Sequence, residues 1–170
     1  MYTRLFRYKT TLTVPKATLK GIGAMGLDSS TVVDLFTRGS QASLMLEHFV
    51  ASELGYEHVG KTGAPYDMLG PEGRLEMRLA HAGRPVAFSQ SSMRGAGRKF
   101  VKKGFLERTR ELAGFLVVST ARFPEITIFE ISAAEVIDLY KRNALGSSGN
   151  LSNTLFLQLR EELSGGRPVR

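Results

Sequence analysis

The stretch that decides the fold is residues 61–103, which read KTGAPYDMLGPEGRLEMRLAHAGRPVAFSQSSMRGAGRKFVKK. Two short strand-like segments carry Asp67 and Glu76, and the Gly-Pro-Glu-Gly sequence at 70–73 predicts a turn between them. A strand–turn–strand unit brings Asp67 and Glu76 towards one end of a hairpin, and strand alternation places Glu76 and Arg78 on one face. Two carboxylates and a cation that converge in this way can hold a hard metal ion beside a phosphodiester.

The residues before this stretch predict a helix and an extended N-terminal segment. Residues 41–54, QASLMLEHFVASEL, have helical periodicity and end at Gly55, a residue typical of a helix C-terminus. Glu47 lies beside the apolar face of this helix, so its carboxylate either points towards a site or stays solvated. Residues 2–14 roughly alternate and predict an extended arm or an edge strand. The glycine-rich residues 20–26 predict a plain connector, because they lack the lysine and hydroxyl of a nucleotide-binding loop.

The residues after the hairpin predict a mixed sheet. Short strands are expected at 56–60, 66–69, 74–80 and 84–91, followed by a basic helix over 99–112. The continuous apolar run 114–120 predicts a strand buried on both faces, the alternating run 125–131 predicts a further strand, and a capping box at Ser132 and Glu135 opens a helix. Residues 153–163 fit a helix or a strand. This order predicts an α/β fold, with a central mixed β-sheet flanked by helices.

Length and charge bound the domain organisation and the class of partner. The 170 residues predict a single domain over 1–170, with a basic N-terminal arm at 1–28 and a flexible tail at 164–170. Lysine and arginine number 23 against 16 acidic residues, giving a net charge of +7, which favours a polyanionic partner. Five basic residues without an acid occur in 1–20 and again in 94–103, as in a binding footprint. The alternative is a basic protein that has no polyanionic partner.

Several classes of protein are excluded by the sequence. There is no cysteine, which excludes disulfides, thiolate zinc sites and thiol nucleophiles. No apolar run approaches 18 residues and no signal-peptide core is present, so we expect a cytoplasmic or nucleoid-associated protein without a membrane partner. The three histidines, at positions 48, 58 and 81, form no metal-ligand spacing and are expected at the surface or in supporting positions.

The candidate chemistry is metal-assisted hydrolysis of a phosphodiester. Mg²⁺ takes few protein ligands and retains several waters, so Asp67, Glu76 and the carbonyl of Met77 are enough to hold it, with Mn²⁺ able to substitute. Arg78 can stabilise charge that develops on the phosphate, but its very high pKa makes it a poor proton shuttle. The same spacing also fits a surface ion pair without a function.

Residues 40–131 resemble the core of the PD-(D/E)XK nuclease superfamily, which has the restriction-endonuclease-like fold. PYDM at 65–68 resembles the "PD" element with Tyr66 inserted, and LEMRLA at 75–80 resembles the "(D/E)-x-K" strand. The helix that carries Glu47 resembles the one that bears an accessory carboxylate in many members. The basic helix followed by the buried strand also agrees with the superfamily's order.

The sequence departs from this superfamily at the third motif position, where Arg78 replaces the usual lysine. Lys61 or Lys99 could then serve instead, or the chain could be a relative that binds without cleaving. Residues 89–100, SQSSMRGAGRKF, contain polar and basic groups that can donate to phosphates or base edges, or they form a solvated loop. The candidate nucleic-acid-binding residues are Gln90, Arg94, Arg98, Lys99, Lys102 and Lys103.

The resemblance therefore implies a Mg²⁺-dependent endonuclease of restriction or homing type that cleaves double-stranded DNA, with Asp67, Glu76, Arg78 and Glu47 as catalytic residues. A homodimer is expected, because two sites can then address two strands. The alternatives are a repair or recombination nuclease, a non-catalytic DNA-binding protein on the same fold, and a basic structural protein.

Overall fold

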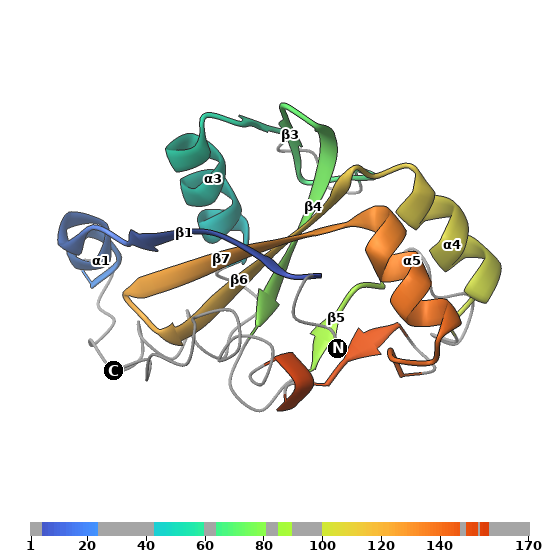
Figure 1. Ribbon diagram of the computed structural model, residues 1–170. Coiled ribbons are helices and arrows are strands. Elements are labelled where there is room, and N and C mark those ends of the chain that lie inside the picture. Colours follow the sequence, from blue (N-terminus) through green and yellow to red (C-terminus); the bar gives the residue numbers. More distant parts are fainter. Residues whose placement is uncertain are drawn as a thin grey trace.

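The computed structural model describes residues 5–23, 43–59, 64–80, 85–89, 100–146, 149–152 and 154–156. Within them, six strands form one mixed sheet in the order β1-β7-β6-β4-β3-β2 (Figure 1). Only β4 and β6 run parallel, and every other pair of neighbours is antiparallel. The strands are β1 (Arg7–Thr13), β2 (Glu57–His58), β3 (Met68–Gly70), β4 (Gly73–Ala80), β6 (Gly114–Arg122) and β7 (Glu125–Ser132).

Helices cover both faces of this sheet (Figure 1). One face packs against α1 (Lys16–Gly23) and α3 (Ser43–Leu54). The other face packs against α4 (Lys102–Arg110), α5 (Ala133–Lys141) and a two-stranded sheet of β5 (Val86–Ala87) and β8 (Asn150–Leu151). The predicted α/β class with a central mixed sheet flanked by helices is therefore confirmed.

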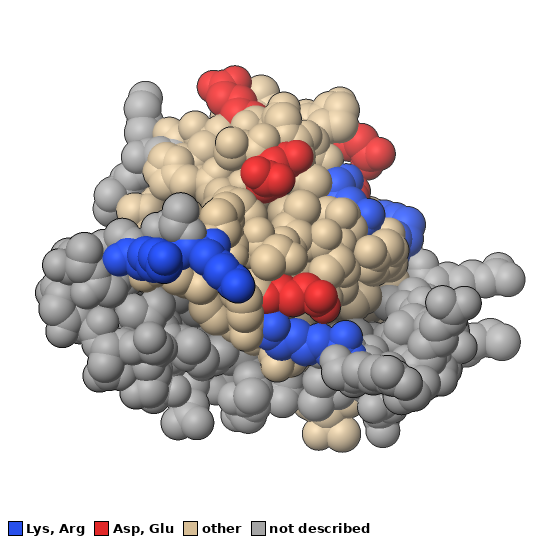
Figure 2. Space-filling model, turned by 90° about the vertical axis from the view of Figure 1, so that its left-hand side faces the viewer, with Lys and Arg blue, Asp and Glu red and all other residues tan. Residues whose placement is uncertain are grey.

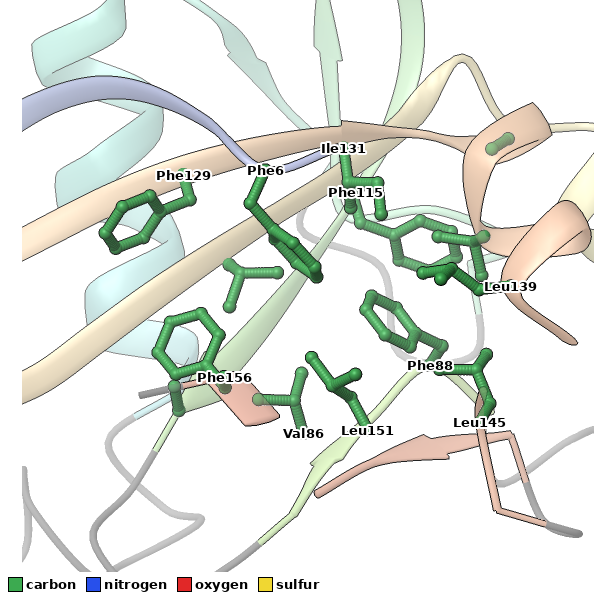
Figure 3. Close-up of a cluster of buried hydrophobic side chains, with 14 of the residues drawn as sticks. Phe6, Val86, Phe88, Phe115, Phe129, Ile131, Leu139, Leu145, Leu151 and Phe156 are labelled. Atoms are coloured by element: carbon green, nitrogen blue, oxygen red, sulfur yellow. The ribbon is translucent and has the colours of Figure 1, made fainter. Parts of the chain in front are cut away.

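An aromatic core fills the space between the main sheet and the layer of α4, α5 and the small sheet. Figure 3 shows Phe115 and Ile131 of the main sheet pointing towards Phe88, Leu151 and Val86 on the small-sheet side. The Phe88 and Phe115 rings meet edge to face at 5.1 Å and 79°, and Phe129 and Phe156 do so at 5.6 Å and 90°. Edge-to-face pairs add a little to the large free energy gained by burying these rings.

An aliphatic core lies on the opposite face, beneath α3. It joins this helix to β3, β4, β6 and β7 through the buried side chains of Leu46, Val50, Met68, Leu75, Met77, Leu116, Val118, Ile126 and Ile128. The odd positions of β4 point into this core, so its even positions, Glu76 and Arg78 among them, face the aromatic core. This alternation decides where the charged groups of β4 lie.

Most of the local predictions are confirmed. Gly55 ends α3 with φ +69°, a conformation that favours glycine, and β6 has seven consecutive buried residues from Gly114 to Thr120. The Ser132 hydroxyl accepts a hydrogen bond from the Glu135 amide, and the Glu135 carboxylate accepts one from the Ser132 amide, which completes the capping box. Residues 7–13 form an edge strand that pairs with β7.

The prediction of a connector over residues 20–26 was wrong for its first part, because α1 continues to Gly23. The helix begins just after Pro15, whose carbonyl accepts from the Thr18 and Leu19 amides. Leu19 packs against the aliphatic core, and this tertiary contact outweighs the low helix propensity of Gly21 and Gly23. Residues 24–26 lie outside the described residues.

Candidate functional site

The β3–β4 hairpin brings Asp67 beside the part of β4 that carries Glu76. Gly70 pairs with Gly73 across a two-residue turn, and Gly73 takes φ +122°, which a residue with a side chain rarely adopts. Met68 pairs with Leu75, and the Asp67 amide donates to the Leu75 carbonyl at 3.0 Å. The predicted approach of Asp67 and Glu76 at one end of a hairpin is thus seen in the backbone.

The Asp67 carboxylate is fixed to the backbone of β4. Strand β3 begins at Met68, which pairs with Leu75, whereas β4 continues to Ala80. The residues of β4 after Leu75 therefore have no ladder partner in β3. There the Met77 amide donates to Asp67 Oδ2 at 2.7 Å. We call Asp67, Glu76, Met77 and Arg78 the carboxylate edge.

Arg78 bridges two other groups of the carboxylate edge. Its Nη2 lies 2.6 Å from Glu76 Oε1, and its Nη1 donates to the Met77 carbonyl at 3.2 Å. Glu76 is only 4% exposed, since it pairs with Phe115 of β6 and faces the aromatic core. Burying a carboxylate costs several kcal/mol without a partner, and the guanidinium supplies that partner. The predicted shared face of Glu76 and Arg78 is confirmed by this contact.

A second group of titratable side chains comes from α3 and β2. His58 Nε2 lies 3.6 Å from Glu47 Oε2, and the His48 and His58 rings stack with centroids 3.7 Å apart and an interplanar angle of 37°. We call Glu47, His48 and His58 the histidine–glutamate cluster. Burial, followed by the charge of Asp67, raises the pKa of the Glu47 carboxyl to about 7, while Arg78 and His48 act in the opposite direction. The cluster is therefore electrostatically coupled to the carboxylate edge.

The candidate metal ligands are brought together without forming a dense ligand cluster. Within the described ranges, no three His, Asp or Glu side chains converge as they would to hold a metal ion. Of the three ligand groups expected from the sequence, Asp67 is bound by an amide, while Glu76 and the Met77 carbonyl contact Arg78. A divalent ion beside Glu76 and Met77 would take the place that the guanidinium has here.

Of the basic residues expected to bind nucleic acid, the structure describes Lys102 and Lys103, which lie in the first turn of α4. The Ala113 amide, just after α4, donates to the Arg74 carbonyl, so the C-terminal end of α4 lies beside the start of β4. Lys102 and Lys103 are at the other end of this nine-residue helix, about 13 Å along its axis. There the Lys102 ammonium lies over the Tyr140 ring at 5.9 Å.

The structure describes only some of the other candidate residues for nucleic-acid binding. Gln90, Arg94, Arg98 and Lys99 lie outside the described residues, as do Lys61, the other lysine that could replace Arg78, and His81. Lys103, whose side chain is 83% exposed, lies 3.8 Å from Glu107. Figure 2 views the side of the molecule where α1 and α3 lie, and its described basic side chains form small separate groups with acidic ones between them. This face shows no single basic footprint among its described residues.

Comparison with known proteins gives no match: no protein-family model, curated protein or solved structure is significantly similar to this chain. None of the helices in the described ranges is long and apolar enough to cross a membrane.

Sequence reasoning did not predict which residue His58 contacts. Its side chain is only 10% exposed and lies against Glu47, so of the two places expected for it, the surface or a supporting position, the structure shows the second. The signal lay in the short connection between α3 and β2, which turns the chain back along the helix. Because His58 pairs with the buried Met68, strand alternation directs both side chains towards α3.

Proposed function

We propose that this protein is a Mg²⁺-dependent endonuclease of restriction or homing type, which hydrolyses phosphodiester bonds of double-stranded DNA at the carboxylate edge. The observation that carries the proposal is the Asp67 carboxylate, which the Met77 amide holds at 2.7 Å, one residue along β4 from Glu76. Holding one carboxylate close to another is electrostatically unfavourable. It is useful where the two oxygens act on a common cation.

The groups of the carboxylate edge fit a hard divalent ion. Asp67, Glu76 and the Met77 carbonyl offer oxygen atoms from adjacent strands, and oxygen is the donor that Mg²⁺ prefers, with Mn²⁺ a substitute. When bound, the ion would supply charge stabilisation and a more acidic water. Arg78 would then release Glu76 and Met77, and its guanidinium could pair with a phosphate oxygen in a bidentate manner.

The order of elements supports the same proposal. The chain runs through α3, β2, β3, β4, β5, α4 and β6. A helix before the two motif strands, and a later helix followed by a buried strand, agree with the order that the resemblance to PD-(D/E)XK nucleases implies. Tyr66, the residue inserted into the PYDM motif, packs against the aromatic core and lies under the Arg74 guanidinium at 5.2 Å. The insertion therefore adds a packing residue in front of Asp67.

A second candidate function is non-catalytic binding of DNA on the same architecture. The observation that favours it is the contact of Arg78 with both Glu76 and Met77, which neutralises the edge without any metal. In that case the edge is a structural ion pair, and binding depends on basic residues elsewhere. A repair or recombination nuclease and the homodimer expected from the sequence remain variants of the first proposal.

The deciding experiment incubates the purified protein with supercoiled plasmid and linear duplexes in Mg²⁺, in Mn²⁺ and in EDTA. The proposed nuclease cuts both substrates with either metal and neither in EDTA. Asp67→Asn and Glu76→Gln should abolish cleavage while leaving DNA binding largely intact, with circular dichroism used to check that each variant is folded. Binding without metal-dependent cleavage would instead support the second candidate.

The role of Arg78 is tested in the same assay. Arg78→Ala should lower the turnover by about 10²–10³-fold, since it removes one preorganised charge from the reacting phosphate. Arg78→Lys should retain turnover or raise it. An Arg78→Ala variant that cleaves as well as wild type would move this role to Lys61 or Lys99.

A further inference from the structure

The start of β4 carries a second arginine, Arg74, which the proposed function does not use. Arg74, Glu76 and Arg78 are all even positions of this strand, so strand alternation turns them towards the same side of the sheet, that of the aromatic core. Arg74 is exposed, because it follows the turn of the hairpin, which forms the upper rim of the molecule in the view of Figure 1. One face of β4 therefore presents a row of cation, carboxylate and cation.

The Tyr66 ring holds the Arg74 guanidinium. The central carbon of the guanidinium lies over this ring, 5.2 Å from its centroid, and Tyr66 itself packs against the aromatic core. The next residue, Asp67, has its carboxylate bound by the Met77 amide at 2.7 Å. Two consecutive residues before β3 thus fix both Arg74 and the carboxylate edge.

The contact with Tyr66 leaves the hydrogen-bond donors of Arg74 available. Among the described residues, no acidic side chain forms a salt bridge with Arg74, and Glu76, two residues along the strand, pairs with Arg78 instead. The face of an aromatic ring attracts a cation through its quadrupole and offers no lone pair to an N–H group. The guanidinium is therefore oriented by the ring while its fork of N–H donors can still bind two oxygen atoms of a phosphate.

We propose that Arg74 binds a backbone phosphate of the DNA strand that is cut at the carboxylate edge, within a few nucleotides of the scissile phosphate, and that Tyr66 is the positioning residue that orients its guanidinium. This inference rests on the proposed function, which places the scissile phosphate beside Glu76 and Arg78. Four residues of an extended strand separate the two arginines by about 13 Å. A further phosphate of the same DNA strand lies within this distance, since successive phosphates advance only about 3.4 Å along the helix axis.

The first test is the binding of a fluorescently labelled DNA duplex in EDTA, where the strands are not cut. Arg74→Ala should weaken binding about tenfold for all sequences alike, because a charge-assisted contact is lost. It should also lower the slope of log affinity against log salt by about 0.9 between about 50 and 200 mM salt. The matched control is Arg142→Ala, which removes the same charge from a side chain that is 68% exposed at the end of α5 and should change neither quantity.

Steady-state cleavage of plasmid in Mg²⁺ distinguishes Arg74 from Arg78. The phosphate that Arg74 contacts does not react, so the contact is equally strong in the bound substrate and in the transition state. Arg74→Ala should therefore raise KM about tenfold and leave kcat little changed, whereas Arg78→Ala lowers kcat. A fall in kcat at unchanged KM in Arg74→Ala would overturn the assignment to a non-reacting phosphate.

The role of Tyr66 is read from a double-mutant cycle in the binding assay. Tyr66→Leu removes the ring and should weaken binding about two- to fivefold in wild type, but should have no further effect in Arg74→Ala. Tyr66→Phe keeps the ring and should bind DNA as wild type does, and circular dichroism checks that each variant is folded. An equal loss from Tyr66→Leu in both backgrounds, or a loss in folded Tyr66→Phe as large as in Arg74→Ala, would overturn the positioning role.

The outcomes separate this inference from the proposed function. If wild type cleaves, and Arg74→Ala binds DNA with the affinity and salt slope of wild type, the nuclease stands and the inference is overturned. If wild type binds DNA without metal-dependent cleavage, the proposed function fails, and the loss of affinity and slope in Arg74→Ala still decides whether Arg74 contacts a phosphate. Absence of DNA binding by wild type overturns both, and an equal loss in Arg142→Ala shows an effect of net charge and overturns the assigned contact.

Discussion

Strands β4 and β6 are parallel neighbours that pair residue by residue, yet on the face turned to the aromatic core they carry opposite kinds of side chain. β6 is buried for seven consecutive residues, and its Phe115 and Val117 belong to the aromatic core. On β4, the residues that pair with these two are Glu76 and Arg78. On one face of the sheet, the side chains of β6 therefore belong to an apolar core, while those of the adjacent β4 form an ion pair.

The difference between the two strands indicates which side chains stabilise the fold and which serve a function. Phe115 and Val117 stabilise the fold through the free energy of burying apolar surface. A partly buried ion pair at the neighbouring positions contributes little or costs stability, because desolvation offsets the Coulombic attraction. We infer that the two charges of β4 are present for what they bind, and each prediction below tests one side of this contrast.

The largest expected effect on stability is at Phe115. Phe115→Ala removes a fully buried ring that meets Phe88 edge to face, so the free energy of unfolding should fall by about 3–5 kcal/mol. Urea denaturation followed by circular dichroism measures it. Leu44→Ala is the control, since Leu44 is 54% exposed on α3 and its replacement should change stability by less than about 0.5 kcal/mol. A small loss at Phe115 would contradict the assignment of the core.

Replacing both charges of β4 by apolar side chains is not expected to lower the free energy of unfolding. Glu76→Met combined with Arg78→Leu replaces the ion pair with apolar side chains of similar volume, which should leave stability unchanged or raise it by about 1–4 kcal/mol. Arg78→Ala alone leaves Glu76 buried without its cation and should destabilise the fold by about 3–5 kcal/mol. A double variant less stable than Arg78→Ala would show that the pair is structural, and the contrast between the strands would disappear.

The Glu47 carboxyl should make stability depend on pH. Its pKa is raised from 4.5 to about 7, so between these values the folded protein keeps a proton that the unfolded chain has released. The free energy of unfolding therefore falls as pH rises from 4.5 to 7, and this contribution is constant above and below that window. Glu47→Gln should flatten the slope relative to wild type in urea titrations from pH 4 to 8, and parallel slopes would count against the raised pKa.

The smallest effect is expected on α4, the helix that comes before β6. Lys103 is exposed, and its pair with Glu107 at 3.8 Å is worth little in water. If α4 contacts DNA, Lys103→Ala should reduce the slope of log affinity against log salt by about one or less and weaken all sequences alike. Binding isotherms at several salt concentrations measure it. A changed slope in Lys16→Ala but not in Lys103→Ala would move the footprint to the N-terminal basic residues.

The sequence predicted those parts of the fold that have a local cause. The Gly-Pro-Glu-Gly turn, the continuous apolar run of β6, the capping box at Ser132 and the end of α3 at Gly55 each depend on a few neighbouring residues. The helix α1 was missed because its two glycines oppose helix formation, while the contact of Leu19 with the aliphatic core favours it only in the folded chain.

In the candidate site, too, the sequence predicted the features that have a local cause and not those that depend on tertiary packing. Hairpin geometry predicted that Asp67 and Glu76 approach each other at one end of the hairpin, and strand alternation predicted that Glu76 and Arg78 share a face. No local rule shows that the Arg78 guanidinium turns back to the Met77 carbonyl, or that His58 lies against Glu47. Those contacts depend on where β3 begins beside β4 and on how α3 packs over β2.

The most direct test of the central claim is a titration of Mn²⁺ followed by the electron paramagnetic resonance signal of the free ion. If the carboxylate edge is a metal site, wild type binds one ion per chain at this edge, and Glu76→Gln and Asp67→Asn lose it. Arg78→Ala, when folded, binds Mn²⁺ more tightly, because the guanidinium no longer competes for Glu76 and the Met77 carbonyl. Absence of binding in wild type, or equal binding in Glu76→Gln, would contradict the account.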